Sequence, residues 1–296
     1  LIKRLNPTES VTVPQTEIHY SYFSDIATLV ITGKGKLMDE SNSKLPWEKF
    51  KKEIKFVTIS KGVTEIGKSS FDGFINLEKV KFPQTLQKIG DFAFNGCSNL
   101  VRIKFPSSLK SIGKSAFSHC TNLKTIRFSE GLESIDSSSF AYCSKLVSVV
   151  IPASVTEIGK KAFNGAKYLK VVEFAKNSQL KIIREQAFCF SGISKMLIPS
   201  SVTKICELSF HFCPNLTSFE FEENSELKII EKSAFYGSPI NHFQVPSSIE
   251  NNDDEWWICL SPNLNNLNVI KNDIQNISNY NDDFILSKSD SKSEIF

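Results

Sequence analysis

The sequence predicts a solenoid: a right-handed curved coil with a parallel β-sheet on its concave face and short strands or irregular helical turns elsewhere. The first observation is a phrase of the form I-G-x-x-A-F-x-x-C-x-N-L-x-x-I-x-F-P-x-S-L, which recurs about every 23 residues. Self-similarity at a fixed period of this size is the signature of stacked coils. The second observation is that one aromatic residue marks every unit: Phe71, Phe94, Phe117, Phe140, Phe163, Phe188, Phe210 and Phe235.

Each unit is expected to contain a short strand. In residues 122–128, N-L-K-T-I-R-F, apolar residues alternate with Thr125 and Arg127, which is the pattern of a strand buried on one face. A proline often follows directly, and proline lacks the backbone N–H that a ladder needs. We therefore expect strands to end just before these prolines: Pro83, Pro106, Pro152, Pro199 and Pro246.

A second extended stretch follows the proline, as in S-V-T-E-I-G at residues 154–159. Glycine then permits a turn, and a short segment ending in A-F is able to form one irregular helical turn before the next strand. Parallel strands need such a crossover, and crossovers are almost always right-handed. Two units are lengthened just after the strand, at residues 175–183 and 222–230, which predicts bulged surface loops.

Composition agrees with an array of this kind and limits the possible functions. The chain has 296 residues, 41% of them hydrophobic, and its 24 Phe against three Trp indicate one aromatic used repeatedly. The net charge of +3 gives no reason to expect a nucleic-acid partner. No apolar run is long enough to span a bilayer, so we expect no transmembrane segment. The chain begins at Leu1, which suggests a mature or trimmed fragment, and its start does not decide localisation.

The seven cysteines are predicted to be packing residues. Cys97, Cys120, Cys143 and Cys213 lie three residues after a repeat Phe, at a position that other units fill with Phe, Ala or Ser. Buried free Cys behaves as a small hydrophobe. Stacked coils bring these residues within disulfide range, but parallel side chains rarely have the required torsion, and an odd total leaves at least one thiol free. No C-x-x-C pair or Cys/His cluster at zinc spacing is present, so no metal and no cofactor are expected.

The units resemble the BspA-like leucine-rich repeat family, whose units read I-G-x-x-A-F-x-x-C-x-x-L-x-x-I-x-I-P. The resemblance covers roughly residues 28–250, and Trp47 is expected to plug the first coil. It implies a leucine-rich repeat solenoid and a microbial surface or secreted protein, often an adhesin that contacts host cells or matrix proteins. We expect four segments: an N-terminal capping segment at 1–50, an array of about eight 22–25-residue units at 51–249, a degenerate C-terminal capping coil at 250–270 and a disordered tail at 271–296.

Residues 62–69, G-V-T-E-I-G-K-S, match the phosphate-binding pattern G-x-x-x-x-G-K-[ST]. That motif works because its Gly-rich loop opens a helix whose N-terminus holds the phosphates, whereas a repeat turn follows here. The same frame recurs at residues 108–115 and 154–161. Chance is therefore the better interpretation, and nucleotide binding is the least favoured function.

The histidines and the glycosylation sequons do not locate a function. His19, His119, His211 and His242 have no Cys or carboxylate at catalytic or ligand spacing, so no catalytic residue and no enzyme activity are predicted. Two sequons would be glycosylation sites in a secreted chain, but sequons also arise by chance in Asn-rich sequence. They begin at Asn215 and Asn276.

The outward strand positions form two columns whose charge changes along the array. The first column runs Phe56, Lys79, Arg102, Thr125, Ser148, Val171, Lys195, Ser218 and His242. The second column runs Thr58, Lys81, Lys104, Arg127, Val150, Glu173, Leu197, Glu220 and Gln244. We expect one basic cluster on adjacent strands about 4.8 Å apart: Lys79, Lys81, Arg102, Lys104 and Arg127. The later units are acidic, with Glu173, Glu220, Glu222 and Glu223.

This basic cluster is a candidate binding site for an acidic protein segment or an anionic glycan. A plainer interpretation is that its charges keep an exposed sheet soluble. We predict a non-enzymatic protein that binds another macromolecule through the sheet face, as a surface or secreted adhesin-like protein. A cytoplasmic interaction scaffold is the alternative, because cytosolic thiols stay reduced. The partner and the oligomeric state stay open, although a poorly capped last coil would expose a sheet edge able to pair with another chain.

Overall fold

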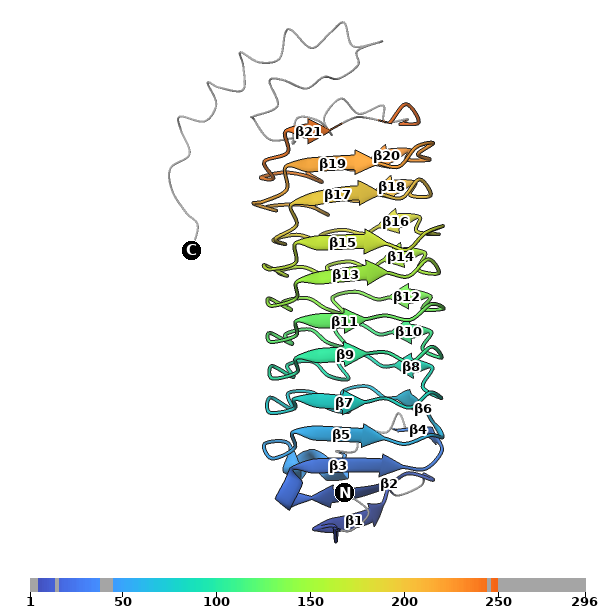
Figure 1. Ribbon diagram of the computed structural model, residues 1–296, viewed down its shortest axis with the longest axis vertical. Coiled ribbons are helices and arrows are strands. Elements are labelled where there is room, and N and C mark those ends of the chain that lie inside the picture. The colour runs from blue at the N-terminus through green and yellow to red at the C-terminus, as the bar shows by residue number, and fades with distance from the viewer. Residues whose placement is uncertain (1–4, 14–15, 38–44, 244–245, 250–296) are drawn as a thin grey trace, which may run out of the picture.

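The chain folds into a stack of coils with a line of strands on each of two sides (Figure 1). The computed structural model describes residues 5–13, 16–37, 45–243 and 246–249. We number the coils one to eight by their repeat Phe, from Phe71 in coil one to Phe235 in coil eight. This arrangement is the parallel β-solenoid that the repeat phrase predicts.

One strand of each coil lies on the side that we call the sheet face, defined by the outward residues of the two columns described above. These face strands are β5 (Phe56–Ile59), β7 (Lys79–Lys81), β9 (Arg102–Lys104), β11 (Thr125–Arg127), β13 (Ser148–Ile151), β15 (Val171–Phe174), β17 (Lys195–Ile198), β19 (Ser218–Phe221) and β21 (His242–Phe243). They lie side by side in parallel, with Lys104 opposite Arg127 and Val150 opposite Glu173. Their hydrogen-bonded ladders form three groups, which meet between β7 and β9 and between β15 and β17.

The second extended stretch of each coil forms a continuous nine-stranded sheet. We call it the second sheet. Its strands are β4 (Gly35–Lys36), β6 (Val63–Ile66), β8 (Lys88–Ile89), β10 (Ser111–Ile112), β12 (Ser134–Ile135), β14 (Glu157–Ile158), β16 (Ile182–Ile183), β18 (Lys204–Ile205) and β20 (Ile229–Ile230). The segments ending in A-F are hydrogen-bonded turns with no helix. Within the described ranges, the helices are the 3-10 segments η2 (Ser24–Ile26) and η3 (Pro46–Phe50).

The repeat Phe side chains stack along the axis as a core ladder. Neighbouring rings from Phe71 to Phe235 have centroids 5.0–5.6 Å apart and interplanar angles of 3–14°. A shorter ladder of Phe82, Phe105 and Phe128 meets the first edge-on in coils two to four. Aromatic pairs add about 0.5–1.5 kcal/mol beyond the burial of their area. The phase-marking Phe of the sequence is therefore the residue that joins each coil to the next.

Two left-handed residues flank each repeat Phe, two positions before it and two positions after it. In coil two, the N–H groups of Phe94 and Gly96 donate to the carbonyls of Ala116 and Ser118 in coil three, at 2.7 and 2.8 Å. The same bonds recur from coil to coil and form a backbone ladder outside any β-sheet. Such left-handed positions cost about 1–3 kcal/mol for residues other than Gly, and they persist where surrounding bonds fix them.

Trp47 closes the N-terminal end of the core ladder, as expected from the sequence. Its side chain is fully buried, and its ring stacks on Phe71 at 6.0 Å and 20°. Its Nε1 donates to the Ser70 carbonyl at 3.2 Å. The equivalent carbonyl one coil later, that of Ala93, accepts the Phe71 N–H at 2.7 Å. Trp47 therefore supplies both the ring and the donor that a preceding coil would supply.

Three strands precede the array: β1 (Glu9–Thr12), β2 (His19–Phe23) and β3 (Thr28–Thr32). They pair antiparallel with one another, and β3 then pairs parallel with β5. The Tyr22 hydroxyl donates to Glu53 at 2.9 Å, and burial together with this bond raises the pKa of Tyr22 to about 12. The capping coil and tail expected at 250–270 and 271–296 lie outside the described residues.

The cysteines of the described ranges are buried free thiols. The Sγ atoms of Cys97, Cys120 and Cys143 each donate to the carbonyl of the repeat Phe in the preceding coil, at 3.2–3.3 Å. Ser238 makes the same bond to Phe210 with its hydroxyl, at 2.6 Å. Burial raises the pKa of these three thiols. This shared bond explains why Cys and Ser interchange at the position, whereas Phe74 and Ala166 fill it without a side-chain donor.

Candidate binding surface

The five predicted cations lie together on the sheet face. Lys79, Lys81, Arg102, Lys104 and Arg127 are all exposed, while the residues between them on β7, β9 and β11 are buried. The order of the strands brings them onto three consecutive coils (Figure 1). Among the described residues, none of the five forms an ion pair. We keep the name basic cluster for this set.

Charged residues on the second sheet behave differently, because they are paired from coil to coil. Glu65 lies 3.3 Å from both Lys36 and Lys88, and Arg184 meets Glu157 through two bonds of 2.7 and 2.9 Å. Further pairs join Lys110 to Glu133, Lys181 to Glu226 and Lys204 to Glu231. The cations on the second-sheet strands, Lys36, Lys88 and Lys204, are thus paired, in contrast to the basic cluster on β7, β9 and β11.

Apolar side chains occupy the middle of the sheet face. Val150 and Leu197 are each 51% exposed, and Val171 is 44% exposed. Val150 lies on β13, next to the basic cluster, while Val171 and Leu197 lie on β15 and β17, among the acidic residues Glu173 and Glu220. An apolar centre with charged surroundings is the usual composition of a protein interface. The sequence shows these residues, but only the register of the strands shows that they form the centre of one surface.

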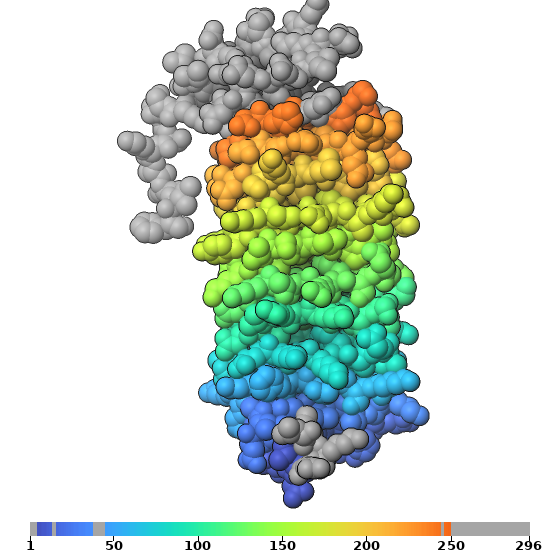
Figure 2. Space-filling view, in the orientation of Figure 1, coloured from blue at the N-terminus to red at the C-terminus, as the bar shows by residue number. Residues whose placement is uncertain are grey.

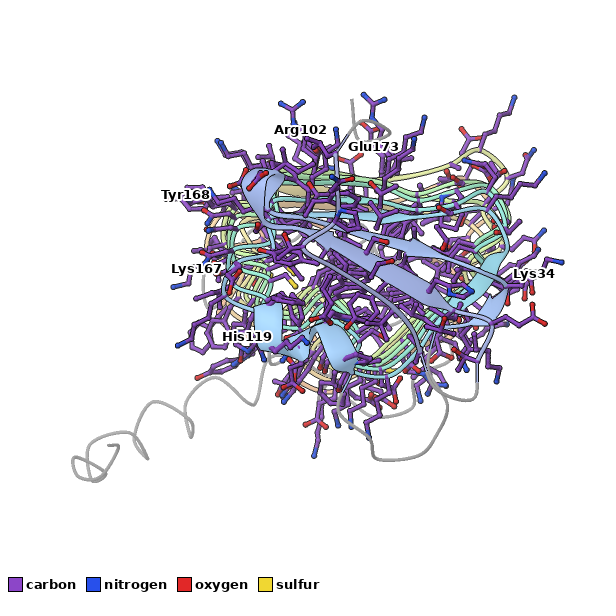
Figure 3. All side chains as sticks on the ribbon, turned by 90° about the horizontal axis from the view of Figure 1, so that it is seen from below. Lys34, Arg102, His119, Lys167, Tyr168 and Glu173 are labelled. Atoms are coloured by element: carbon purple, nitrogen blue, oxygen red, sulfur yellow. The ribbon has the colours of Figure 1, made fainter. Side chains whose placement is uncertain are left out.

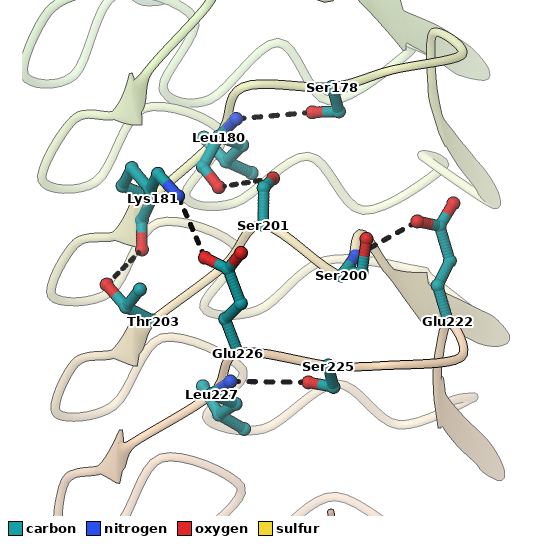
Figure 4. A network of polar contacts seen from close by, with 10 residues as sticks. All are labelled: Ser178, Leu180, Lys181, Ser200, Ser201, Thr203, Glu222, Ser225, Glu226 and Leu227. Atoms are coloured by element: carbon teal, nitrogen blue, oxygen red, sulfur yellow. Dashed lines mark hydrogen bonds and ion pairs between the residues drawn. The ribbon is translucent and has the colours of Figure 1, made fainter. Parts of the chain in front are cut away.

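The acidic residues follow on the later coils. Glu173 on β15 and Glu220 on β19 are exposed in the second column, and Glu220 accepts a hydrogen bond from Ser218 at 2.6 Å. Glu222 and Glu223 lie in the loop after β19, where Glu222 accepts the Ser200 N–H at 2.9 Å (Figure 4). Arg102 and Glu173 project from the same side of the stack, away from His119 (Figure 3).

The two lengthened units form surface loops that contact each other. The Ser201 hydroxyl donates to the Leu180 carbonyl at 2.8 Å, and Lys181 pairs with Glu226 at 2.9 Å (Figure 4). Space-filling surfaces show successive coils in close contact along the stack (Figure 2). These loops border the acidic end of the sheet face.

A second exposed feature, aromatic side chains on the turns, was missed by the sequence reasoning. His119, Tyr142, Phe190 and Phe212 occupy the left-handed position two residues after the repeat Phe, where the other four coils have Gly. His119 stacks on Tyr142 at 4.7 Å, and Phe190 stacks on Phe212 at 5.6 Å. A Cβ on Gly165 would lie 2.7 Å from the Tyr142 ring, so that Gly makes room for the stack. The available signal was the recurrence of Gly at this position in the repeat phrase.

Glu185, Cys206 and Glu231 bring one possible ligand atom each within 4.8 Å of one another. Lys204 already pairs with Glu231 at 2.6 Å, and the Glu207 N–H donates to the same carboxylate at 2.8 Å. Burial opposes ionisation of Glu231, but these hydrogen bonds hold its pKa below the usual value. Burial raises the pKa of Cys206 to about 11. The cluster is therefore a charge network already satisfied by a lysine, and not a metal centre.

The remaining sequence candidates do not form a site in the described residues. Residues 62–69 contain strand β6 and are followed by turns, so the helix that a phosphate-binding loop requires is missing there. The four histidines lie on separate elements: His19 pairs with Thr12, His242 is on β21, and His119 and His211 pack against rings on the turns. Asn215 is exposed before β19, and Asn276 lies outside the described ranges. In the part of the chain that the structure describes, none of the helices could cross a membrane.

Fold and surface together define a leucine-rich repeat solenoid with a mixed charged and apolar sheet face. The chain matches the BspA type leucine rich repeat region, in six copies, over residues 48–170 and 133–265. It belongs to this family. Leucine-rich repeat proteins of this kind bind other proteins and are typically non-enzymatic.

Several solved structures are similar. A leucine-rich cell surface protein from Faecalibacterium prausnitzii is 25% identical with a TM-score of 0.56, and the match covers 82% of this chain and 66% of that one. The chain thus spans just under two thirds of that relative. A leucine-rich repeat protein from Bacteroides ovatus is 17% identical (TM-score 0.45; coverage 81% and 90%), and the pneumococcal vaccine antigen PcpA is 19% identical (TM-score 0.44; coverage 85% and 90%). No curated protein matches the chain.

Proposed function

We propose that this protein is a non-enzymatic, adhesin-like surface or secreted protein that binds another macromolecule through its sheet face. The observation that carries the proposal is the contrast between the two sheets. Cations on the second sheet are paired with carboxylates, whereas the five cations of the basic cluster are exposed and have no ion pair among the described residues. Charges that serve only solubility have no reason to be segregated in this way.

The expected ligand is a protein with an acidic segment or an anionic glycan. Unpaired cations on neighbouring strands give a local positive potential that speeds association and orients the partner. Exposed charges are screened by salt over about 8–10 Å. Binding should therefore be faster at low ionic strength and weaken as salt is added.

The surface location is supported by the cell surface relative at 25% identity. The cytoplasmic scaffold remains the second candidate, because every cysteine in the described ranges is a buried free thiol. Labelling intact cells with a membrane-impermeant amine reagent separates the two proposals. Modification of the protein before lysis supports the surface location, and modification only after lysis supports the scaffold.

A matched pair of triple variants tests the sheet face. Lys81→Glu, Lys104→Glu and Arg127→Glu reverse the second column of the basic cluster, while Lys88→Glu, Lys110→Glu and Lys181→Glu change the net charge equally on the second-sheet side. Fluorescently labelled proteins are applied to cultured epithelial cells and to a sulfated glycan surface, with folding checked by circular dichroism. We expect the first variant to lose binding and the second to keep it. Equal binding by both variants would exclude the basic cluster as the binding site.

A further inference from the structure

If a second copy of the second column is laid against the first in the opposite direction, basic residues of one copy lie opposite acidic residues of the other. Counted outward from Val150 on β13, the residues one coil away are Arg127 and Glu173, and the residues three coils away are Lys81 and Glu220. The column is thus basic on one side of Val150 and acidic on the other. All four of these charged residues are exposed.

Two identical faces meet in a closed pair about a two-fold axis. For faces in contact, that axis lies in the plane between them. If the axis runs along the stack, each coil faces the same coil of the second copy. The two basic clusters then face each other and repel. An axis along strand β13 reverses the order of the coils and places Arg127 opposite Glu173 of the partner subunit, and Lys81 opposite Glu220 of the partner subunit.

We propose that the sheet face binds a second copy of this chain, face to face and antiparallel, about a two-fold axis along β13. This rests on the proposal that the sheet face is a binding surface, and it names the chain itself as one partner. Symmetry doubles the two opposite-charge contacts to four. Self-pairing explains why the basic and acidic coils of the second column lie at equal distances from an uncharged centre.

The apolar residues lie at the proposed axis or within two coils of it. Val150 meets its own equivalent at the axis, and it is 51% exposed in the single chain. Leu197, also 51% exposed, lies opposite Lys104, whose aliphatic stem can cover it while the ammonium group stays in water. Val171 in the first column lies opposite Thr125. The axis therefore passes over an apolar residue, with Arg127 opposite Glu173 of the partner subunit one coil away and Lys81 opposite Glu220 of the partner subunit three coils away.

The dimensions predict a weak association. From β7 to β19 there are six strand intervals, or about 29 Å at about 4.8 Å each, and the patch is only two columns wide. Two columns are about 7 Å apart along a strand, so the patch covers a few hundred Å² at most. This area is less than the roughly 800 Å² that each partner buries in a stable complex. Arg102 opposite Lys195 in the first column opposes the pair further. Many copies on facing surfaces would bind more tightly through avidity than one pair in solution.

Sedimentation equilibrium of three proteins tests the proposal, at about 20 mM and about 500 mM NaCl. The acidic variant carries Lys81→Glu and Arg127→Glu, and the basic variant carries Glu173→Lys and Glu220→Lys. We expect the wild type to self-associate at low salt and to dissociate at high salt. Each variant alone should bind itself at least about tenfold more weakly, whereas a 1:1 mixture should associate, because each acidic position then faces a lysine or arginine.

The outcomes separate this inference from the proposed function. A wild type that stays monomeric at low salt, or variants that self-associate as well as the wild type, would overturn self-pairing. If the acidic variant also keeps its cell and glycan binding, Lys81 and Arg127 are excluded as the site of the proposed function as well. A monomeric wild type whose cell binding is lost in the acidic variant would leave the proposed function standing without the second copy.

Discussion

Trp47 provides the sharpest test of how the array begins. Its indole is fully buried, stacks on Phe71 and donates to the Ser70 carbonyl at 3.2 Å. Trp47→Ala removes both contributions, and a buried Trp replaced by Ala costs about 3–5 kcal/mol. Trp47→Phe keeps a ring and removes the donor. An acceptor left unsatisfied in a buried position costs about 1–3 kcal/mol, so the two variants should differ by roughly 2 kcal/mol in the free energy of unfolding.

Urea unfolding followed by far-ultraviolet circular dichroism measures both values without relying on tryptophan emission. Hydrogen exchange of coils one and two shows where stability is lost, because a repeat array transmits stability between nearest neighbours. We expect exchange to quicken at Phe71 first and to stay slow at Phe188. A Trp47→Phe protein within 0.5 kcal/mol of the wild type would refute the role of the Nε1–carbonyl bond. Uniform loss of protection along the array would refute the role of Trp47 as a terminal cap.

Further predictions concern the core, the turns and the sheet face. Phe117→Ala should lower the free energy of unfolding in urea by about 3–5 kcal/mol, because the Phe117 ring is buried between Phe94 and Phe140. Phe190→Ala should lower it by under about 1.5 kcal/mol, because the Phe190 side chain is 49% exposed. Equal losses of stability would contradict the role of the core ladder. Burial lowers the pKa of His211. Its contribution to stability is therefore present above the unfolded-state pKa of about 6.5 and is lost as pH falls through the folded value. Protection of the coil-seven amides, corrected for the intrinsic exchange rate at each pH, should fall as pH drops below about 6.5, and His211→Phe should abolish that fall; an unchanged profile would show that another group is responsible. Lys195→Glu should strengthen self-association, measured by sedimentation, because it then faces Arg102 of the partner subunit; a weaker association would contradict the antiparallel register.

The repeat phrase was sufficient to predict the solenoid, because a fixed period translates directly into stacked coils. Alternation around Thr125 and Arg127 placed the face strands, and the position of Cys97 predicted a packing role that the buried thiol confirms. The A-F segments, expected to form one irregular helical turn each, form hydrogen-bonded turns that do not extend into a helix, since left-handed residues on both sides of the repeat Phe interrupt any helical run. Local pattern cannot show this, because the bonds that hold those residues come from the next coil.

The candidate site was predictable only as a set of residues. Periodicity assigned Lys81, Lys104 and Arg127 to one column, and the register of the strands agrees with that order. Whether these cations form ion pairs depends on where side chains of other coils lie, and the spacing of residues in the sequence does not show this. The same holds for Tyr142 and Phe212, whose exposure follows from the turn geometry and not from their neighbours in sequence.

The turn ladder gives one side of the stack an electrical direction. On this side of coils one to seven, the N–H of the repeat Phe and those of residues two positions before or after it point toward the next coil, and the accepting carbonyls point back toward Trp47. Peptide dipoles of about 3.5 D that are aligned in this way add along an axis. The summed dipole of the turn side has its positive end toward coil eight and its negative end toward coil one. In an α-helix the positive end is instead at the N-terminus. Elsewhere in the coils, backbone bonds run the other way, as from the Gln87 N–H to the Thr64 carbonyl and from the Gly90 N–H to the Ile66 carbonyl. The turn side and the second-sheet side of the stack therefore carry opposed rows of dipoles, and each added coil lengthens both.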